Sequence, residues 1–179
     1  GGSPYANIHV YPVNDGEYAF YLSTHSGLQI QDVNIYVHDN GSSTISGIYQ
    51  NTFSYLKMYR CTLDGDSGCQ DAVRIYINVY TPTIIDSVRF QGSWTNALNK
   101  NLTSGLCIVT NCVFSGIPIV SQSIPGTTII GCQFDNAYIN SSRGGSIGSG
   151  MARIIGCFFK NVNYQYGIRV GPFVNVVGN

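Results

Sequence analysis

Charged side chains are scarce in this sequence. Only 10% of its 179 residues are Asp, Glu, Lys or Arg, the formal net charge is zero, and Glu17 is the single glutamate. The nine basic residues are scattered along the chain. Because nucleic-acid binding needs clustered Lys and Arg that displace counterions from phosphates, this distribution predicts no nucleic-acid partner.

Long apolar runs and segments with the helical period are missing as well. No stretch of 18 apolar residues occurs, so the sequence predicts no membrane insertion. Gly, Asn, Ser, Thr, Ile and Tyr are abundant, a composition that favours an extracellular or virion-surface location. The length predicts one domain, which we place at residues 5–179, with residues 1–4 as a tag or linker.

A short pattern recurs every 20 to 28 residues. In segments 107–116, 127–136 and 152–161, apolar residues lie three before a cysteine, at the cysteine and two after it, and Gly or Asn lies four after it. Segments 56–65 and 83–92 fit the same pattern, and 28–37 and 5–10 fit it more loosely. We call the central residue position zero; it is Ile8, Val33, Cys61, Val88, Cys112, Cys132 and Cys157.

The spacing within each repeat predicts two short strands separated by a bend, because apolar residues alternate on either side of one odd step of three. A third alternation often follows, for example at Ile75, Ile77 and Val79. The bend itself falls on residues that tolerate unusual backbone angles: Asp32, Ser87, Asn111, Gly131 and Gly156.

Three short strands per repeat predict a parallel β-helix in which equivalent residues stack. We expect three internal stacks, formed by Phe90, Phe114, Phe134 and Phe159; by Ile85, Val109, Ile129 and Ile154; and by Cys112, Cys132 and Cys157. The alternative is a Greek-key sandwich, which also has many short strands but would not repeat one pattern along the chain.

With its variable repeat length and mixed Phe, Cys and Ile stacks, the sequence resembles the right-handed, pectin-lyase-like β-helix proteins, which include bacteriophage tailspikes. The resemblance implies an all-β, right-handed parallel β-helix of about seven coils of three short strands. It also implies a viral or phage tailspike, fibre or surface-adhesin segment that binds host-surface polysaccharide as a homotrimer. A polysaccharide lyase or glycoside hydrolase, and a structural spacer, are the alternatives.

The last residues repeat the pattern once more. Segment 174–179 matches 152–157 position for position, which puts Asn179 at position zero of a further coil. Since an open coil leaves apolar surface and unpaired strand edges, we expect the chain to be part of a longer solenoid or to be covered by another subunit.

Segment 63–76, LDGDSGCQDAVRIY, supports three interpretations. Its GDSG resembles the nucleophile signature of trypsin-like proteases, but that chemistry needs a histidine base beside Ser67. Asp64, Asp66 and Asp71 could supply oxygens to calcium, although no cofactor is required. The interpretation we favour is an Asx-rich turn lengthened by insertion.

Candidates for catalysis are few. Glycoside hydrolysis needs two carboxylates roughly 5–9.5 Å apart, and the acidic residues nearest one another in the predicted coils, with one arginine, are Asp64, Asp66, Asp71, Asp86 and Arg74. The sequence lacks a Gly-His-Gly, and Arg74-Ile75-Tyr76 only half resembles the Arg-Ile-Lys of β-helix hydrolases. The sequence therefore leaves enzymatic activity open and favours binding.

Outward positions of the third strand indicate carbohydrate binding. Ring faces cover apolar sugar faces while amides and guanidinium groups bind hydroxyls, and the predicted site combines both in Arg74, Tyr76, Asn78, Tyr80 and Trp94. The alternative is that tyrosine lies on β surfaces through propensity alone. Other outward positions are apolar, which favours a partner subunit: Ile84, Ile108, Val113, Ile130, Ile155, Phe158 and Val177.

The six cysteines are expected to be structural. Equivalent thiols in stacked coils point in parallel, which favours small apolar core residues over disulfides. A bridge between Cys61 and Cys69, or between Cys107 and Cys112, stays open.

Overall fold

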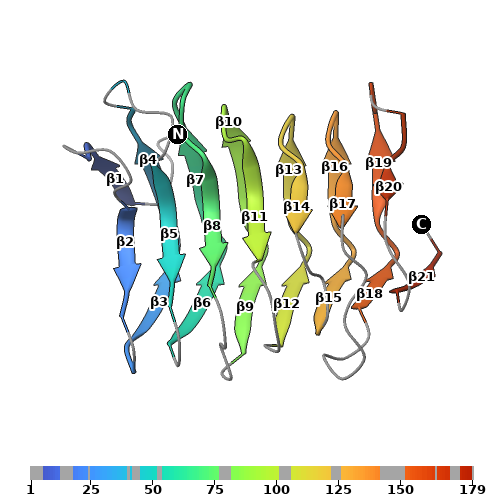
Figure 1. Cartoon of the computed structure of the whole chain (residues 1–179), viewed down its shortest axis with the longest axis horizontal. Coiled ribbons are helices and arrows are strands. Elements are labelled where there is room, and N and C mark those ends of the chain that lie inside the picture. The colour runs from blue at the N-terminus through green and yellow to red at the C-terminus, as the bar shows by residue number, and fades with distance from the viewer. Residues whose placement is uncertain are drawn as a thin grey trace.

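The computed structural model describes residues 6–12, 18–23, 25–39, 41, 45–51, 54–76, 82–100, 106–121, 126–141, 152–163, 165–169 and 174–178. These ranges contain strands and turns, and none of them contains a helix that could cross a membrane. The strands form three parallel sheets of seven strands each (Figure 1).

Each coil contributes one strand to each sheet in turn. Sheet A contains β1 (Ala6–Val10), β4 (Val33–Val37), β7 (Thr62–Gly65), β10 (Arg89–Gly92), β13 (Val113–Ser115), β16 (Gln133–Asp135) and β19 (Phe158–Lys160). Sheet B contains β2 (Tyr18–Leu22), β5 (Ser46–Gln50), β8 (Asp71–Ile75), β11 (Asn96–Lys100), β14 (Ile119–Ser121), β17 (Ile139–Ser141) and β20 (Ile168–Arg169). Sheet C contains β3 (Gly27–Gln31), β6 (Tyr55–Tyr59), β9 (Thr83–Asp86), β12 (Cys107–Thr110), β15 (Thr127–Ile130), β18 (Ala152–Ile155) and β21 (Val174–Val177).

The chain is therefore a parallel β-helix, as predicted, and the sandwich alternative is wrong. A sandwich has antiparallel neighbours, whereas every strand here pairs in parallel with the equivalent strand of the next coil. The two strands recognised in each repeat are the sheet C strand and the sheet A strand of the following coil.

The predicted bend between those strands is confirmed. The residue before position zero has a positive φ in successive coils, at Asp32, Arg60, Ser87, Asn111, Gly131, Gly156 and Gly178, with angles between 49° and 61°. Arg60 and Ser87 are unusual there, because this left-handed conformation costs most residues about 1–2 kcal/mol and suits Gly and Asn better.

The three predicted internal stacks are also confirmed. Consecutive rings of Phe90, Phe114, Phe134 and Phe159 lie nearly parallel, with centroids 5.0, 4.7 and 4.6 Å apart. Ile85, Val109, Ile129 and Ile154 pair in register through sheet C and are fully buried. The equivalent side chains thus form a continuous apolar core along the solenoid.

None of the six cysteines forms a disulfide, and all are buried. Burial raises the pKa of Cys107 to about 11, and a hydrogen bond with Cys112, reinforced by burial, raises the pKa of Cys132 to about 12. The thiols behave as small core residues, as expected. The bridges left open between Cys61 and Cys69 and between Cys107 and Cys112 are not present.

The first coil corrects one assignment. Ala6 pairs with Val33, and Ile8 pairs with Ile35, so Ala6 and not Ile8 stands at position zero. A slip of two residues along a strand keeps every side chain on its face, and for that reason the apolar pattern alone did not fix the register. At the other end β21 pairs with β18 as predicted, from Ala152 with Val174 to Ile155 with Val177, whereas Asn179 lies outside the described residues.

The predicted outward apolar positions do face out of the core. Phe158 is 60% exposed, Ile130 and Val177 are exposed, and Ile84, Ile108, Val113 and Ile155 are half-buried.

Two polar side chains, in contrast, lie inside the corner between sheets B and C. Gln50 accepts a hydrogen bond from Thr83 at 2.6 Å, and Lys100 lies 3.4 Å from the Thr127 hydroxyl. Burial lowers the pKa of Lys100.

Candidate functional site

Three tyrosines of sheet B and a fourth that directly follows β8 lie against one another across three coils. Ring centroids of Tyr49 lie 4.4 Å from Tyr18, 5.5 Å from Tyr21 and 5.8 Å from Tyr76. The parallel pairing of β2, β5 and β8 places Tyr21, Tyr49 and Arg74 at equivalent positions, while Tyr18 lies opposite Ser46 and Tyr76 directly follows β8. We call Tyr18, Tyr21, Tyr49 and Tyr76 the tyrosine ladder.

Polar groups flank the tyrosine ladder. The Arg74 guanidinium lies 5.9 Å from the centre of the Tyr49 ring, within the range of a cation–π contact. Asn51 donates a hydrogen bond of 2.9 Å to the hydroxyl of Tyr21, whose side chain is 54% exposed. Burial raises the pKa of Tyr49, so its hydroxyl stays protonated at neutral pH and can donate. The surface therefore offers ring edges, hydroxyls, amides and one guanidinium.

The predicted carbohydrate-binding residues have different outcomes. Arg74 in β8 and Tyr76 directly after it are half-buried beside Tyr49. Asn78 and Tyr80 lie outside the described residues. Tyr18, Tyr21 and Tyr49 were not predicted, although the equivalence of their strands with β8 would have found them once the register was known.

The expected exposure of Trp94 is wrong, since its side chain is 4% exposed. Trp94 lies at the corner between β10 and β11 and packs over glycines of earlier coils. A Cβ atom added to Gly65 would lie 2.5 Å from the Trp94 ring, and one added to Gly47 would lie 3.1 Å from it. Side chains in corners do not alternate between the two faces as they do in strands. The direction of the Trp94 side chain could therefore not be predicted from the alternation of the third strand.

The acidic residues of segment 63–76 lie in three different places: one strand, the corner after it, and the next strand. Asp64 lies in β7 and accepts a hydrogen bond of 2.7 Å from Gln91. Asp66 begins a turn closed by the Cys69 amide, which donates to the Asp66 carbonyl at 3.2 Å. This turn confirms the favoured interpretation for residues 66–69. Asp71, however, belongs to β8 and not to the turn.

The three carboxylates proposed for calcium have separate partners. Asp66 contacts His38 at 3.0 Å, and Asp71 accepts hydrogen bonds from Asn96 at 2.7 Å and Asn99 at 3.1 Å. Within the described ranges, no group of three His, Cys, Asp or Glu side chains is arranged to hold a metal ion. The GDSG serine, Ser67, is exposed and makes no described contact with a histidine.

Asp86 and Arg74 complete the predicted catalytic set. Asp86 ends β9 in sheet C and accepts hydrogen bonds from Thr110 at 2.8 Å and from Asn111 at 3.1 Å. Arg74 lies in sheet B, 3.9 Å from Asp71. The candidates are thus spread over all three sheets, and each carboxylate already accepts hydrogen bonds.

A chain of two histidines and one carboxylate was not foreseen. His9 and His38 lie 3.0 Å apart through ring nitrogens, and the other ring nitrogen of His38 contacts Asp66 at 3.0 Å. Tyr11 stacks on His38 at 4.3 Å, and Tyr36 stacks on His9 at 4.7 Å. Because these residues come from three coils, only the register of sheet A brings them together.

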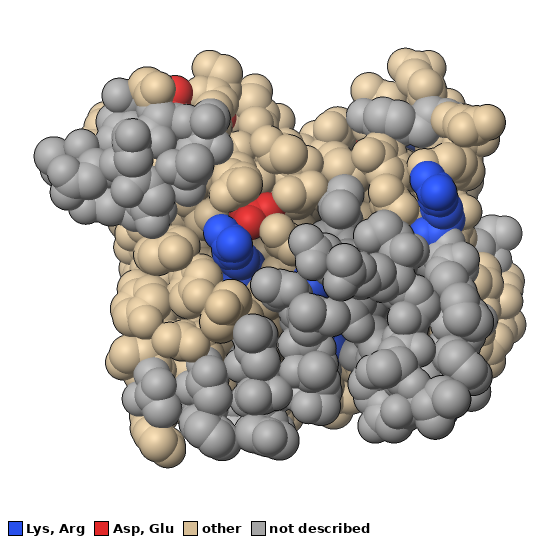
Figure 2. Space-filling view, in the orientation of Figure 1, with Lys and Arg blue, Asp and Glu red and all other residues tan. Residues whose placement is uncertain are grey.

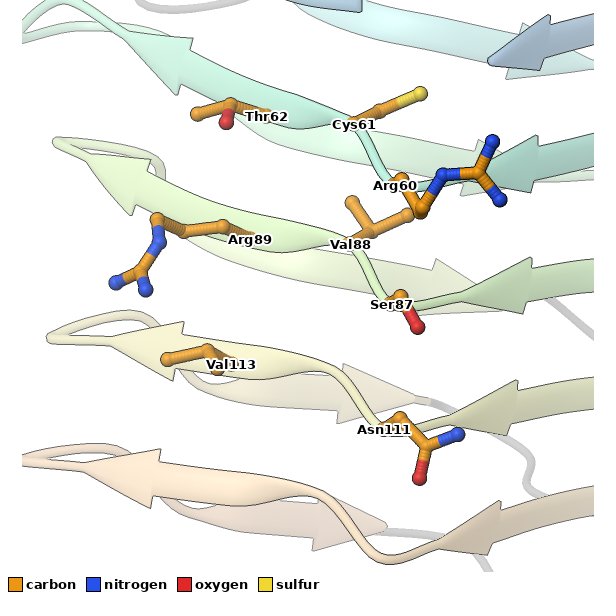
Figure 3. Close-up of a pocket in the computed structure, with 8 residues that line it drawn as sticks. All are labelled: Arg60, Cys61, Thr62, Ser87, Val88, Arg89, Asn111 and Val113. Atoms are coloured by element: carbon orange, nitrogen blue, oxygen red, sulfur yellow. The ribbon is translucent and has the colours of Figure 1, made fainter. Parts of the chain in front are cut away.

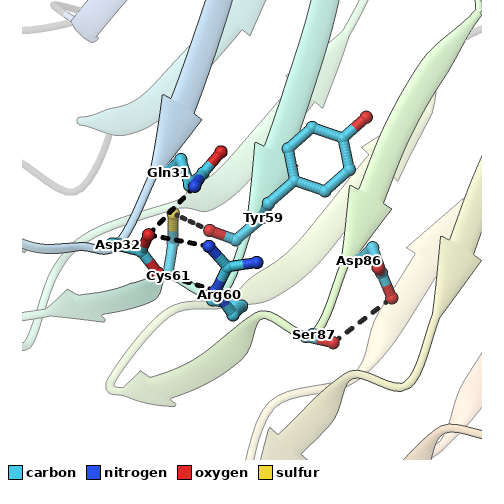
Figure 4. Close-up of polar contacts among 7 residues, drawn as sticks. All are labelled: Gln31, Asp32, Tyr59, Arg60, Cys61, Asp86 and Ser87. Carbon is cyan, nitrogen blue, oxygen red and sulfur yellow. Dashed lines mark hydrogen bonds and ion pairs between the residues drawn. The ribbon is translucent and has the colours of Figure 1, made fainter.

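A hollow of about 370 Å³ lies at the bend between sheets C and A. Three successive coils line it (Figure 3) through Arg60, Cys61, Thr62, Ser87, Val88, Arg89, Asn111 and Val113. Arg60 is held by Asp32 through two hydrogen bonds of 2.7 Å (Figure 4). These bonds, with a third from Gln31, hold the pKa of Asp32 below its ordinary value.

Most of the described residues visible in Figure 2 are uncharged, and only a few Lys, Arg and Asp side chains appear between them. It carries no broad basic surface among the described residues. This agrees with the low charge of the sequence, in which basic and acidic residues are equal in number.

The stacked sheets, the repeated bend and the internal stacks define the class of this protein, a parallel β-solenoid. No protein-family model, curated protein or solved structure matches the chain.

Asp71 gives a pH-dependent prediction. Burial raises its pKa above the ordinary 3.8, so the folded state binds this proton more tightly than the unfolded state does. The resulting stabilisation is present below the unfolded pKa and is lost as pH rises through the raised folded pKa. We therefore expect burial of Asp71 to lower the melting temperature of the unsubstituted chain as pH rises from 3 to 7. Thermal unfolding of Asp71→Asn over the same pH range should not show this decrease.

Asp135 provides the matched control of opposite sign. Hydrogen bonds from Asn161 and Lys160 lower its pKa, so its contribution is present above the unfolded pKa and is lost as pH falls. Asp135→Asn should therefore remove stability at neutral pH and none at low pH. Parallel pH profiles for Asp71→Asn and the unsubstituted chain would contradict the effect assigned to burial of Asp71.

Proposed function

We propose that this chain binds carbohydrate of a host surface through the tyrosine ladder, as a segment of a viral or phage tailspike, fibre or surface adhesin. The observation that carries the proposal is the row formed by Tyr18, Tyr49 and Tyr76 across successive coils, with Arg74 over Tyr49. A polysaccharide chain can run along this row and meet an aromatic ring at each of the three coils.

The chemistry of the row supports a sugar ligand. Tyrosine combines an apolar ring with a hydroxyl, and partly covered aromatic surface beside amides is typical of saccharide recognition. Arg74 and Asn99 both contact Asp71, which fixes their positions without consuming all their donors. A rigid β scaffold limits the conformational entropy lost on binding.

Exposed apolar side chains support the oligomer implied by the tailspike resemblance. Phe158, Ile130 and Val177 are exposed on sheets A and C, away from the tyrosine ladder.

The homotrimer and calcium binding stay predictions. No contact among the described residues favours the lyase or hydrolase over binding, so we propose binding alone.

The test is the loss of binding on replacing Tyr49 with alanine. Tyr49 contacts the three other tyrosines of the ladder, so its removal breaks the row, and we expect about tenfold weaker binding, equivalent to about 1.4 kcal/mol. A glycan array identifies a ligand, and calorimetry then measures its affinity for the unsubstituted and substituted chains. Reducing ends counted in the same samples detect cleavage.

Tyr55→Ala is the matched control, because Tyr55 is an exposed tyrosine at the start of β6 on sheet C. It should leave the affinity unchanged. Equal losses for Tyr49→Ala and Tyr55→Ala, or no loss for Tyr49→Ala, would exclude the ladder as the site. Release of reducing ends would replace the binding proposal with the enzymatic one.

A further inference from the structure

The hollow at the bend between sheets C and A is separate from the tyrosine ladder. Its volume of about 370 Å³ falls in the range of small-ligand sites, roughly 300–1,000 Å³. Apolar side chains of Val88 and Val113 lie between polar ones, with Thr62 and Ser87 on neighbouring coils (Figure 3). Val88 is 1% exposed, so the apolar surface of the hollow comes from the half-buried Val113, and this surface beside the hydroxyls of Thr62 and Ser87 suits a sugar ring better than a bare inorganic ion.

Arg89 supplies a positive charge without a described partner. Its side chain is exposed on the outer face of β10, and no residue of the described ranges bonds to its guanidinium. No carboxylate side chain lines the hollow. An acidic group entering here would therefore pair with Arg89 without displacing an internal partner, and guanidinium forms strong bidentate contacts with such groups.

Arg60 is fixed at the other end of the hollow. Figure 3 shows the side chains of Arg60 and Arg89 pointing to opposite ends. Two hydrogen bonds to Asp32 orient Arg60, so it can meet a ligand with little loss of side-chain entropy. Its positive φ of 49° is strained for an arginine, whereas the equivalent bends of later coils carry Gly131 and Gly156.

We propose that this hollow binds an acidic sugar residue, with the carboxylate or sulfate group on Arg89 and ring hydroxyls near Arg60 and Ser87. The proposal gives the protein a second saccharide contact, selective for charge, at the opposite side of the coil from sheet B. It does not rest on the tyrosine ladder, because Arg89 lies in sheet A and Tyr49 in sheet B.

The test compares lactose, 3′-sialyllactose and lactose 3′-sulfate by titration against the full chain. We expect at least one acidic sugar to bind about tenfold or more tightly than lactose, as a charged hydrogen-bonded pair predicts. The tighter of the two identifies the acid as carboxylate or sulfate. Equal affinity for all three sugars, or no binding of either acidic sugar, would overturn the proposal.

Two substitutions should weaken the site to different extents without unfolding the chain. Arg89→Gln introduces the residue found at the equivalent Gln133, and it should abolish the preference for acidic sugars. Arg60→Gly relieves the positive φ and should weaken binding about threefold, because it removes hydrogen bonds but not the charge pair.

Arg153→Gln is the control, since Arg153 is an exposed arginine of β18 outside the hollow. Equal effects of Arg89→Gln and Arg153→Gln would show general charge attraction and overturn the site. Displacement of the acidic sugar by an equal concentration of inorganic phosphate would also overturn the proposal. Tyr49→Ala should leave the acid preference intact, which separates failure of this proposal from failure of the ladder.

Discussion

Replacing Phe114 with alanine is expected to lower the free energy of unfolding by about 3–5 kcal/mol. Phe114 is fully buried, and its ring lies between those of Phe90 and Phe134 at 5.0 and 4.7 Å. Truncation leaves a cavity between two rings that the stacked coils cannot approach to fill, because interstrand hydrogen bonds fix their spacing. Urea unfolding followed by circular dichroism measures the change.

Phe114→Leu is the matched control. Leu63 occupies the equivalent position two coils earlier, so leucine fits this stack, and the substitution should cost clearly less than alanine does. Ser115→Ala, at the neighbouring outward position of β13, should be close to neutral. A cost below about 1 kcal/mol for Phe114→Ala would mean that the phenylalanine stack contributes little to stability.

Trp94→Ala is expected to destabilise the chain by a similar amount, about 3–5 kcal/mol. The ring is 4% exposed and fills space beside Gly65 and Gly47. Because both positions are glycines, no neighbouring side chain can replace the lost ring volume. Chemical unfolding gives the stability, and the affinity for any identified glycan, measured on the folded protein, should not change.

Trp94→Phe should recover much of that loss. The indole Nε1 of Trp94 is buried without a hydrogen-bond partner in the described structure, so phenylalanine removes an unsatisfied donor while keeping most of the ring. Thr95→Ala, at the exposed neighbour, should have little effect. Full stability of Trp94→Ala together with loss of glycan binding would restore Trp94 to the binding surface and contradict its role in the core.

Much of the fold could be predicted because the solenoid repeats its own pattern. The alternation around position zero predicted the strands of sheets C and A, the bend and the stacks, including all four rings from Phe90 to Phe159. Less of the candidate site was predictable. Arg74 and Tyr76 were identified from their strand, but Tyr18, Tyr21 and Tyr49 lie in coils where the repeat is weak.

The residues that were misplaced have different physical reasons. Trp94 lies at a corner and Asp71 at a strand start, where side chains follow no fixed period. Ile8 was shifted by two residues because such a slip preserves the face of every side chain. The burial of Lys100 was not predicted, because its contact with Thr127 joins the end of β11 to the start of β15 and has no counterpart in the local pattern.

The sequence by itself determined the class of the fold and the residues inside the solenoid. Equivalent residues of successive coils stack at a fixed strand spacing, so the apolar positions within each repeat are the positions of the core. Only the tertiary structure decided which outward side chains meet. Contacts such as Tyr49 with Tyr76, His38 with Asp66, and Arg60 with Asp32 join residues about one coil apart. Corner length sets the register of those pairs, and corners carry no periodic signal.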